Sequence, residues 1–327
     1  LLQAGFDVTI EHDLTRAISI ESYSGAQVAG TGDWRSAPKE AIIIGLKELP
    51  EEITPLHHRH IMFGHAFKDQ PDGQKLLERF QAGGGTLYDL EYLTDDTGRR
   101  VAAFGYWAGY AGAAVAIKSW AAAQKGNICQ PLQTFASAKD LNADVASDLG
   151  KKNPSIIIIG ANGRVGSGAQ DFCAALGASV TCWDIEETAH GGPFPEILDH
   201  DIFLNCILAN KNTPVFVPKK AKIGPRKLMV IGDIACDPGS FYSPIKVYDC
   251  ATSWEKPALR VHKDKILDIT AIDNLPSLLP RESSEDFAAQ LLPHLMMLQE
   301  IEKGVWGKAC AIFNEYISRT NAAKSQS

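Results

Sequence analysis

The hydrophobic pattern in the first third of the chain alternates short apolar runs with one helical stretch. The runs at 41–45 and 61–64 are apolar enough for buried strands, and a third strand is expected at 86–90. Before the third strand, residues 74–81 have helical spacing and lead into consecutive glycines, which end helices readily. Because strands and helices alternate, this part of the chain is predicted to form a parallel sheet.

The rest of the chain continues this alternation. Residues 101–123 are apolar but interrupted by glycines and a lysine, so they predict a buried helix that connects two domains, not a membrane span. Residues 127–153 are polar and predict a linker with a surface helix. Further strands are expected at 155–159, 179–183, 201–206, 228–234 and 245–248, and helices at 169–176 and from about 280 onward.

Length and charge narrow the class of protein. With 327 residues and 45% hydrophobic content, the chain is long enough for two domains. Its formal net charge of -7 argues against a general binder of nucleic acid or anionic membranes, because such proteins depend on basic surfaces. The first letters, LLQAGFDVTIEHD, are typical of a helix end, a glycine stop and a strand, so an element is expected to precede Leu1.

Cysteine and histidine patterns predict no metal site. The cysteines are scattered and lack the paired spacing of zinc ligands, so they are expected to be reduced, buried thiols of a cytoplasmic protein. His57, His58 and His60 are close in sequence but lack the i,i+4 spacing of ligands on one helix face. These histidines are expected in a loop or on a helix surface.

The strongest local motif is a glycine-rich turn at 160–168. The letters SIIIIGANGRVGSG place this turn directly after an apolar strand and at the start of a helix. Glycines let the backbone approach a pyrophosphate, and the amino terminus of a helix presents N–H groups and partial positive charge to it. The spacing departs from the strict GxGxxG pattern, and glycines used only for tight packing are the alternative.

An acidic residue follows at the distance that a dinucleotide site requires. Asp184 ends the next expected strand, where its carboxylate can accept hydrogen bonds from the ribose hydroxyls of the adenosine. The neighbouring Glu186 and Glu187 would repel a 2′-phosphate. The pattern therefore favours NAD over NADP as the cofactor.

Several blocks, which keep their order over almost the whole chain, carry a more specific signal. They are LKE at 46–48, GHAFKDQ at 64–70, GTLYDLE at 85–91, GRRVAAFG at 98–105, WDI at 183–185, GGPF at 191–194 and IDNLPSLLPRE at 272–282. Together they resemble the fungal saccharopine dehydrogenases, the NAD-dependent, L-lysine-forming family. That family is remotely similar to alanine dehydrogenase and transhydrogenase.

The resemblance implies a fold and a reaction. The fold would be α/β, with two Rossmann-like domains that have parallel sheets and an active-site cleft between them. Residues 1–103 plus 282–327 would form the substrate (catalytic) domain, and residues 104–281 the NAD-binding Rossmann domain with one parallel, helix-covered sheet. The reaction would be the NAD-dependent oxidative deamination of L-saccharopine with water to L-lysine and 2-oxoglutarate, the last step of α-aminoadipate lysine biosynthesis. The protein is expected to be a monomer that binds small molecules and neither nucleic acid nor a membrane.

The resemblance also implies roles for individual residues. The two acid–base positions fall on Lys47 and His65, and the residues expected to tune them are Glu48, Lys68 and Glu91. The positions that would contact saccharopine are Lys47, Gln70, Arg100, Phe104, Ala235, Cys236 and Asp237. The positions that would contact NAD are Arg99, Gly163, Arg164, Asp184, Thr188, Leu208, Ile234, Ile272, Asp273, Asn274 and Leu275.

The chemistry of saccharopine explains why such residue types are needed. Its secondary amine must lose a proton before hydride can leave the neighbouring carbon, and water must then add to the resulting imine. Lys47 is assigned to the amine proton and His65 to the water and carbinolamine steps, and the residues alone leave the reverse division open. Lys68 would favour the neutral form of Lys47, whereas Glu48 and Glu91 would favour its charged form.

Two other interpretations fit the sequence less well. Another amino-acid dehydrogenase of the alanine dehydrogenase type would share the cofactor site but need a smaller pocket with fewer cationic groups. A non-catalytic NAD-binding protein would retain the fold without the chemistry. Without the resemblance, Lys47, His65, Arg99 and Arg100 would be assigned as solvated or structural residues, because isolated residues of these types usually are.

Overall fold

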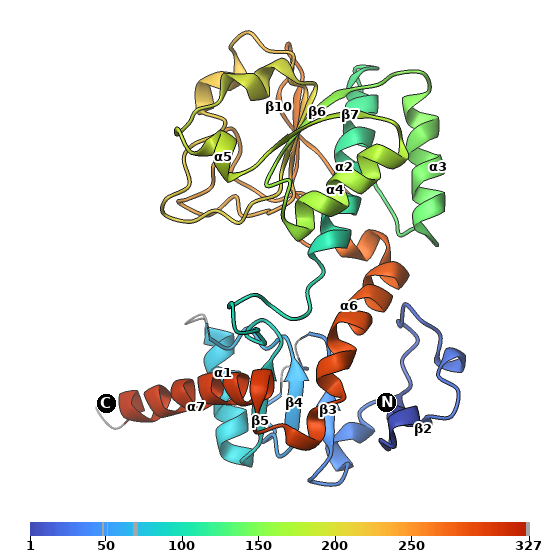
Figure 1. Ribbon diagram of the computed structural model, residues 1–327, viewed down its shortest axis with the longest axis vertical. Coiled ribbons are helices and arrows are strands. Elements are labelled where there is room, and N and C mark those ends of the chain that lie inside the picture. The colour runs from blue at the N-terminus through green and yellow to red at the C-terminus, as the bar shows by residue number, and fades with distance from the viewer. Residues whose placement is uncertain (48, 51, 68–70, 325–327) are drawn as a thin grey trace. The chain divides into compact units, whose positions relative to one another are not determined.

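The chain folds into two compact units (Figure 1). The structure is a computed structural model, and it describes residues 1–47, 49–50, 52–67 and 71–324. The first unit combines Leu1–Ala103 with Asp286–Ser327, and the second unit is Phe104–Glu285. Among the described residues, no helix combines the length and the apolar character needed to cross a membrane.

A small parallel sheet forms the centre of the first unit. Its three strands pair in the order β3-β4-β5, and a separate parallel pair, β1-β2, lies nearer the amino terminus. A helix connects β4 to β5, as the helical spacing at 74–81 predicts. The elements are β1 (Thr9–Glu11), β2 (Gln27–Ala29), β3 (Ile42–Ile44), β4 (Arg59–Met62), α1 (Pro71–Gly83) and β5 (Thr86–Asp89).

The C-terminal helix α7 (Gly304–Lys324) packs on this first sheet and its helix. Trp306 lies edge-on to Tyr88 of β5 with ring centroids 6.0 Å apart, and Phe313 lies edge-on to Phe80 of α1 at 5.7 Å. All four rings are at least nine-tenths buried. Aromatic burial therefore joins the end of the chain to its beginning.

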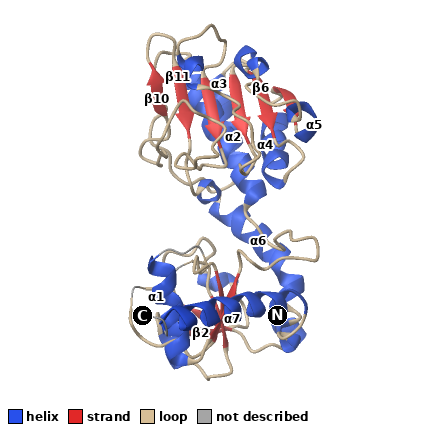
Figure 2. Ribbon diagram, turned by 90° about the vertical axis from the view of Figure 1, so that its left-hand side faces the viewer, coloured by secondary structure: helices blue, strands red, loops and turns tan. Residues whose placement is uncertain are grey.

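The second unit is built on a six-stranded sheet, whose strands lie side by side in Figure 2 with β10 at one edge. The order is β10-β11-β9-β8-β6-β7, and every neighbouring pair is parallel except β10 and β11. The strands are β6 (Ser155–Ile159), β7 (Ser179–Trp183), β8 (Ile202–Asn205), β9 (Val230–Asp233), β10 (Leu259–His262) and β11 (Leu267–Thr270). Strands β7 and β8 lie on opposite sides of β6, so the order in which the strands are added to the sheet reverses at β6. Open α/β sheets bind their ligands at such a reversal of strand order.

The two faces of this sheet are covered differently. Three helices cover one face: α2 (Gly105–Ala123), α3 (Ala138–Leu149) and α4 (Arg164–Ala175). The other face is covered by irregular segments between β7 and β10, whose buried side chains include Phe194, Phe216 and Val247. The expectation of a helix-covered sheet is therefore correct for one face and wrong for the other.

Helix α2 is apolar on almost every side because it lies inside the unit. It touches α4 at glycines on both helices. A Cβ atom on Gly109 would lie 1.8 Å from the Val165 carbonyl oxygen, and one on Gly168 would lie 1.9 Å from that of Tyr106. The small residues of 101–123 therefore allow two helix backbones to meet, which explains their frequency in this stretch.

The remaining helical elements are short or lie at the boundary between the units. Helix α5 (Ile185–Thr188) follows β7, and helix α6 (Pro280–Leu295) continues across the boundary at Glu285. The 3-10 helices are η1 (Leu2–Ala4), η2 (Ile20–Ser22), η3 (Asp33–Ser36), η4 (Pro195–Asp199), η5 (Lys219–Lys222), η6 (Leu275–Leu278) and η7 (Leu298–Glu300).

Two sequence-based expectations about elements are wrong. Residues 245–248 form no strand: Ile245 and Val247 are fully buried, but the segment makes only an isolated bridge between Ile245 and Val217. The helix expected at 101–123 begins at Gly105 and lies within the second unit, so it does not itself connect the two units.

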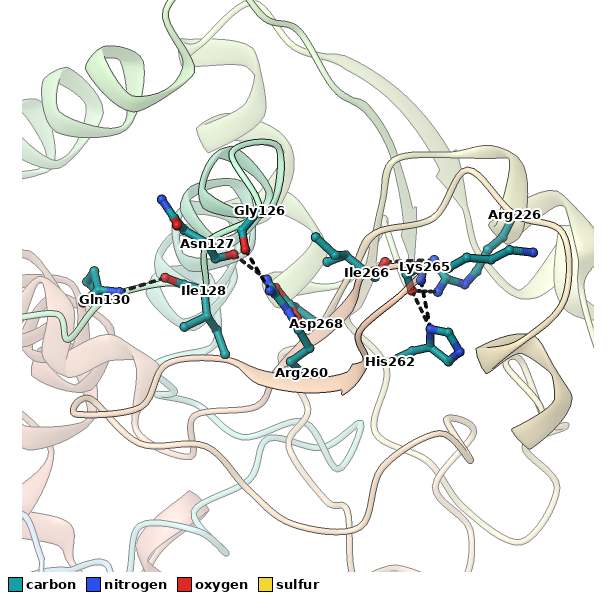
Figure 3. Close-up of polar contacts among 10 residues, drawn as sticks. All are labelled: Gly126, Asn127, Ile128, Gln130, Arg226, Arg260, His262, Lys265, Ile266 and Asp268. Atoms are coloured by element: carbon teal, nitrogen blue, oxygen red, sulfur yellow. Dashed lines mark hydrogen bonds and ion pairs between the residues drawn. The ribbon is translucent and has the colours of Figure 1, made fainter.

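Two arginines hold the β10–β11 hairpin at the sheet edge (Figure 3). Arg260 donates to both carboxylate oxygens of Asp268 at 2.8 Å each, and also to the carbonyls of Gly126 and Asn127 just after α2. Asp268 is fully buried, so this two-point pair neutralises a charge inside the protein. Arg226 donates to the backbone carbonyls of Lys265 and Ile266, just before β11, and to that of Leu228, just before β9.

Candidate functional site

The carboxyl edge of a sheet is here the side on which its parallel strands end. In the second unit this edge collects the residues that the sequence assigns to the cofactor, except Arg99, which lies in the first unit. They follow the ends of five strands: Gly163 and Arg164 after β6, Asp184 and Thr188 after β7, Leu208 after β8, Ile234 after β9, and 272–275 after β11. This is the side on which open α/β sheets bind ligands.

The glycine turn after β6 is open at one position and tightly packed at another. A Cβ atom on Gly163 would meet nothing closer than the Gly160 carbonyl oxygen at 3.5 Å, an ordinary contact. A Cβ atom on Gly166 would lie only 2.1 Å from the same oxygen. Gly163 is also the N-cap of α4, and no side-chain hydrogen bond caps this end of the helix. Helix ends of this kind favour the binding of an anion.

Asp184 has a structural function that leaves part of its carboxylate open to further hydrogen bonds. Its Oδ2 accepts a hydrogen bond from the backbone N–H of Asn162 at 2.8 Å, and its Oδ1 accepts one from that of Ile185 at 2.9 Å. The Glu187 carboxylate in turn accepts from the Asp184 N–H at 2.7 Å, which completes a capping box at α5. A carboxylate has about four acceptor sites, so Asp184 can also bind hydroxyl groups.

The other cofactor positions divide into buried and exposed side chains. Ile234, Ile272 and Leu275 are at least nine-tenths buried in the core beneath α2, so only their backbone could contact a ligand. Leu208 is 80% exposed, and Asn274 is exposed while its Oδ1 accepts from the Trp254 indole N–H at 3.0 Å. Thr188 donates its hydroxyl to the Asp184 carbonyl at 2.8 Å.

A buried aspartate supports the turn after β9, where Ala235, Cys236 and Asp237 lie. Asp233 is 2% exposed and accepts from the Tyr248 hydroxyl at 2.5 Å and from the Asn205 amide at 2.9 Å. Burial raises the pKa of Asp233, and hydrogen bonds from Tyr248, Asn205 and the Cys236 N–H oppose this rise. The network was not predicted, although an aspartate within an apolar strand is the signal that could have revealed it.

Cys236 itself has a left-handed backbone with φ of 45°. Its thiol donates to the Ala271 carbonyl at 3.1 Å, and burial raises the pKa of the thiol to about 12. The thiol is therefore neutral at ordinary pH and is not activated as a nucleophile. Asp237 is exposed at the end of this turn.

The carboxyl edge of the first unit collects the acid–base candidates. Lys47 follows β3, His65 follows β4 and Glu91 follows β5, and these three strands are neighbours. The Nδ1 atom of His65 lies 3.7 Å from Oε2 of Glu91. Lys47 is exposed, and the His65 side chain is 42% exposed. The predicted tuning residues Glu48 and Lys68 and the substrate position Gln70 lie outside the described residues.

Two arginines follow β5 on a tight turn. The Asp95 carboxylate accepts from the Arg99 backbone N–H at 3.0 Å, and Thr94 pairs with Arg100 across the turn. Arg99 and Arg100 are exposed. Phe104 is half-buried and begins the second unit directly before α2.

The histidines and cysteines depart in part from the expectation. His60 is not on a loop or helix surface: it lies on β4, is 1% exposed, and burial lowers its pKa to about 4. His58 lies in the loop before β4 but is also buried. Among the described residues, no group of side chains could hold a metal ion. The cysteines are free, but Cys182 and Cys250 are exposed and not buried as expected.

Comparison with known proteins first defines the class. The solved structure of an L-alanine dehydrogenase matches with a TM-score of 0.64 at 18% identity, over 91% of this chain and 83% of that one. A family model described as alanine dehydrogenase/PNT, N-terminal domain, matches residues 1–111. The chain therefore has the two-part α/β fold of the alanine dehydrogenase type, and the fold class expected from the sequence is confirmed.

Closer relatives define the family. The saccharopine dehydrogenase [NAD(+), L-lysine-forming] of Candida albicans is 42% identical over 98% of this chain and 91% of its own length. Proteins with the same name from Yarrowia lipolytica and Schizosaccharomyces pombe are 42% and 41% identical over 98% of this chain. The chain belongs to this family of NAD-dependent, L-lysine-forming saccharopine dehydrogenases.

Proposed function

We propose that the chain catalyses the NAD-dependent oxidative deamination of L-saccharopine with water to L-lysine and 2-oxoglutarate. The observation that carries the proposal is the place of Lys47 and His65 after neighbouring strands of one parallel sheet. Two groups that can exchange protons thus share one edge, as a reaction with an amine proton and a water proton requires. Relatives named for this reaction are similar over nearly the full chain.

The second unit fits NAD. The open side of the turn at Gly163 and the uncapped amino terminus of α4 would receive the pyrophosphate. The Asp184 carboxylate would accept from the ribose hydroxyls, and the exposed Glu186 and Glu187 would repel a 2′-phosphate. When bound there, NAD would supply the hydride acceptor of the reaction. We assign the remaining contacts to Arg99, Arg164, Thr188, Leu208, Ile234 and 272–275.

The first unit would move the protons. Lys47 takes the proton from the secondary amine, so that the nitrogen lone pair can assist the departure of hydride from the neighbouring carbon. His65 removes a proton from the water that adds to the imine carbon. It then gives this proton to the nitrogen and takes the hydroxyl proton of the carbinolamine as the C–N bond breaks to form 2-oxoglutarate and L-lysine. Glu91, whose Oε2 lies 3.7 Å from Nδ1 of His65, orients the ring.

Cationic and polar groups would bind the rest of the substrate. Arg100 has the planar, two-point donor geometry that suits a substrate carboxylate, and its exposed position leaves it accessible. Gln70, Phe104 and residues 235–237 are the other substrate positions in the proposal. Residues 1–103 plus 282–327 would form the substrate domain, residues 104–281 would bind NAD, and the enzyme would be a cytoplasmic monomer.

A substrate comparison tests the proposed function. The ultraviolet absorbance of NADH should rise when the protein, NAD and saccharopine are combined, and it should stay constant with alanine in place of saccharopine. A rise with alanine alone would identify an alanine dehydrogenase-type enzyme. NAD binding without turnover of either substrate would identify a non-catalytic NAD-binding protein.

Replacing Asp184 by alanine tests the cofactor site. Losing charge-assisted hydrogen bonds to the ribose should weaken NAD binding by about 1.5–3 kcal/mol and narrow the preference for NAD over NADP. Calorimetric titration of each dinucleotide measures both effects, with Glu186→Gln as a control that keeps the Asp184 carboxylate. Unchanged NAD affinity in Asp184→Ala would show that the ribose binds elsewhere.

A further inference from the structure

Asp89 is a buried carboxylate that the proposed reaction does not use. It is the last residue of β5 and is 1% exposed. One carboxylate oxygen, Oδ1, accepts from the backbone N–H of Glu91 at 2.9 Å. The other, Oδ2, is buried and makes no hydrogen bond of good geometry among the described residues, although the Gly64 N–H is near enough to favour its charge. A buried acceptor without a good hydrogen bond is rare in folded proteins and calls for an explanation.

Asp89 lies beneath the turn that carries His65. It pairs in register with Met62, the last residue of the neighbouring strand β4. A Cβ atom on Gly64 would lie 3.3 Å from this Oδ2, a tight contact, and 2.7 Å from Cδ2 of Leu87, so a glycine at 64 lets the turn pass close to both side chains. His65 follows directly with φ of 48°, and the only other non-glycine residue with positive φ among the described residues is Cys236.

The same carboxyl group therefore touches both strand-end turns that form the His65–Glu91 pair. The N–H groups of Glu91 and of Gly64 both favour its charged form. The contact with the Glu91 N–H fixes the turn after β5, which presents Glu91. The contact with Gly64 fixes the left-handed turn after β4, which presents His65. A left-handed residue other than glycine persists only where its surroundings hold it in place.

The fold gains little stability from this charge. Burial raises the pKa of Asp89, and the neighbouring Glu91 charge adds to the rise, against the opposing effect of the two N–H groups and His65. A raised carboxyl pKa means that stability is lost as pH rises through the pKa of the folded state. Ionisation of Asp89 therefore costs stability, which is expected where a residue is retained for function.

We propose that Asp89 is a positioning residue that holds His65 and Glu91 in the geometry needed for proton transfer. The proposal rests on the proposed function of this site, because it assigns Asp89 an effect that acts through His65. A residue with a merely structural role would instead lower stability when it is replaced and leave the turnover of the folded molecules unchanged.

The Asp89→Asn variant of the full chain tests this proposal. Its Oδ1 can still accept from Glu91, but its NH₂ group would face the Gly64 N–H, so the turn before His65 should shift. A misplacement of about 1 Å at a catalytic group can cost on the order of 100-fold in rate, so kcat should fall by about 10- to 100-fold. The KM for saccharopine and the NAD affinity should change little.

Stability and isotope effects separate positioning from support of the fold. The melting temperature of Asp89→Asn should be equal to or higher than that of the wild type, and the difference should grow from about pH 4 towards neutrality, because the variant lacks the raised carboxyl pKa. With saccharopine deuterated at the carbon that loses hydride, the isotope effect on kcat should shrink, because the His65 steps become rate-limiting. A fall in melting temperature with unchanged kcat and isotope effect would overturn the proposal.

A matched control and a double variant complete the experiment. His58 is buried at the opposite end of β4, where its Nε2 lies 3.0 Å from the Ala37 carbonyl oxygen, so His58→Asn should lower the melting temperature without changing kcat. The double variant Asp89→Asn/His65→Gln should be no slower than His65→Gln alone, because Asp89 acts through His65. If the two losses in kcat multiply in the double variant, Asp89 does not act through His65. If His65→Gln is itself as fast as the wild type, the proposed function has failed independently of Asp89.

Discussion

Lys47→Met and His65→Gln should each lower kcat for saccharopine oxidation by roughly 10²- to 10⁴-fold, the usual contribution of a general acid or base. Both side chains lie past neighbouring strand ends in the first unit, whereas the residues assigned to NAD's pyrophosphate and ribose lie in the second. NAD affinity should therefore remain close to the wild-type value in both variants. Steady-state kinetics together with calorimetric NAD titration measures the two quantities.

The two variants should differ in the step that they slow. Without Lys47 the substrate amine keeps its proton. The limb of the pH–rate profile that reports the ionisation of Lys47 should therefore disappear. Without His65 imine hydrolysis becomes slow while hydride transfer stays comparatively fast. A substrate deuterated at the reacting carbon should then give a smaller isotope effect in His65→Gln than in the wild type.

Two control variants make this comparison specific. Lys39→Met removes an exposed lysine that precedes β3, and His57→Gln removes an exposed histidine that precedes β4. Both changes lie at the opposite ends of the same strands, and kcat should not change. Wild-type rates in both Lys47→Met and His65→Gln would remove the basis for the proposed site. A double variant no slower than the slower single variant would show that the two groups act as one unit.

Gly166→Ala should prevent the second unit from folding stably. The added Cβ atom would lie 2.1 Å from the Gly160 carbonyl oxygen and 2.6 Å from the Ala161 Cα atom, both of them backbone atoms of the glycine turn. Relief would require moving α4 away from β6, and overpacking of a dense core costs about 1–3 kcal/mol or more. Thermal unfolding followed by circular dichroism should show a much lower melting temperature, and NAD binding should be lost.

Gly163→Ala is the matched comparison for the same turn. Its Cβ atom would make only an ordinary 3.5 Å contact, and Gly163 has φ of -79°, which any residue can adopt. This variant should therefore fold like the wild type but bind NAD more weakly, because the new methyl group would stand where the pyrophosphate is proposed to bind. A Gly166→Ala protein as stable as Gly163→Ala would contradict the packing of the turn described above.

The sequence predicted the elements whose pattern depends on local contacts. The run of isoleucines at 156–159 and the glycines after it could form little other than a buried strand and a turn. The β10–β11 hairpin was missed because β10 is only partly buried and the buried β11 contains a charged residue, Asp268. Arg260 neutralises that charge and also binds Gly126 and Asn127, which are distant in sequence. Residues 245–248 were assigned as a strand because burial on the face of a sheet gives an irregular segment the same apolar pattern.

The candidate site was predictable residue by residue only through the family resemblance. The spacing of residues indicated the glycine turn at Gly163 and the acidic residue Asp184, because a dinucleotide-binding motif depends on local backbone geometry. The buried carboxylates of Asp89 and Asp233 were not assigned, since their partners come from neighbouring strands and from segments that no short pattern connects. Each of them ends an otherwise apolar strand, which is a signal that deserves more weight in similar sequences.

The structural hydrogen bonds of Asp184, together with its proposed contact to the ribose, would limit how the cofactor preference could evolve. A protein that accepts the phosphorylated dinucleotide must lose the charge at this position, yet the same carboxylate caps α5 and holds the Asn162 N–H of the glycine turn. An alanine would remove all of these bonds at once, whereas a serine or an asparagine could keep the cap while lowering the repulsion. Any lineage that changed its redox partner would therefore be expected to pass through such a capping residue first, and to replace Glu186 and Glu187 only afterwards.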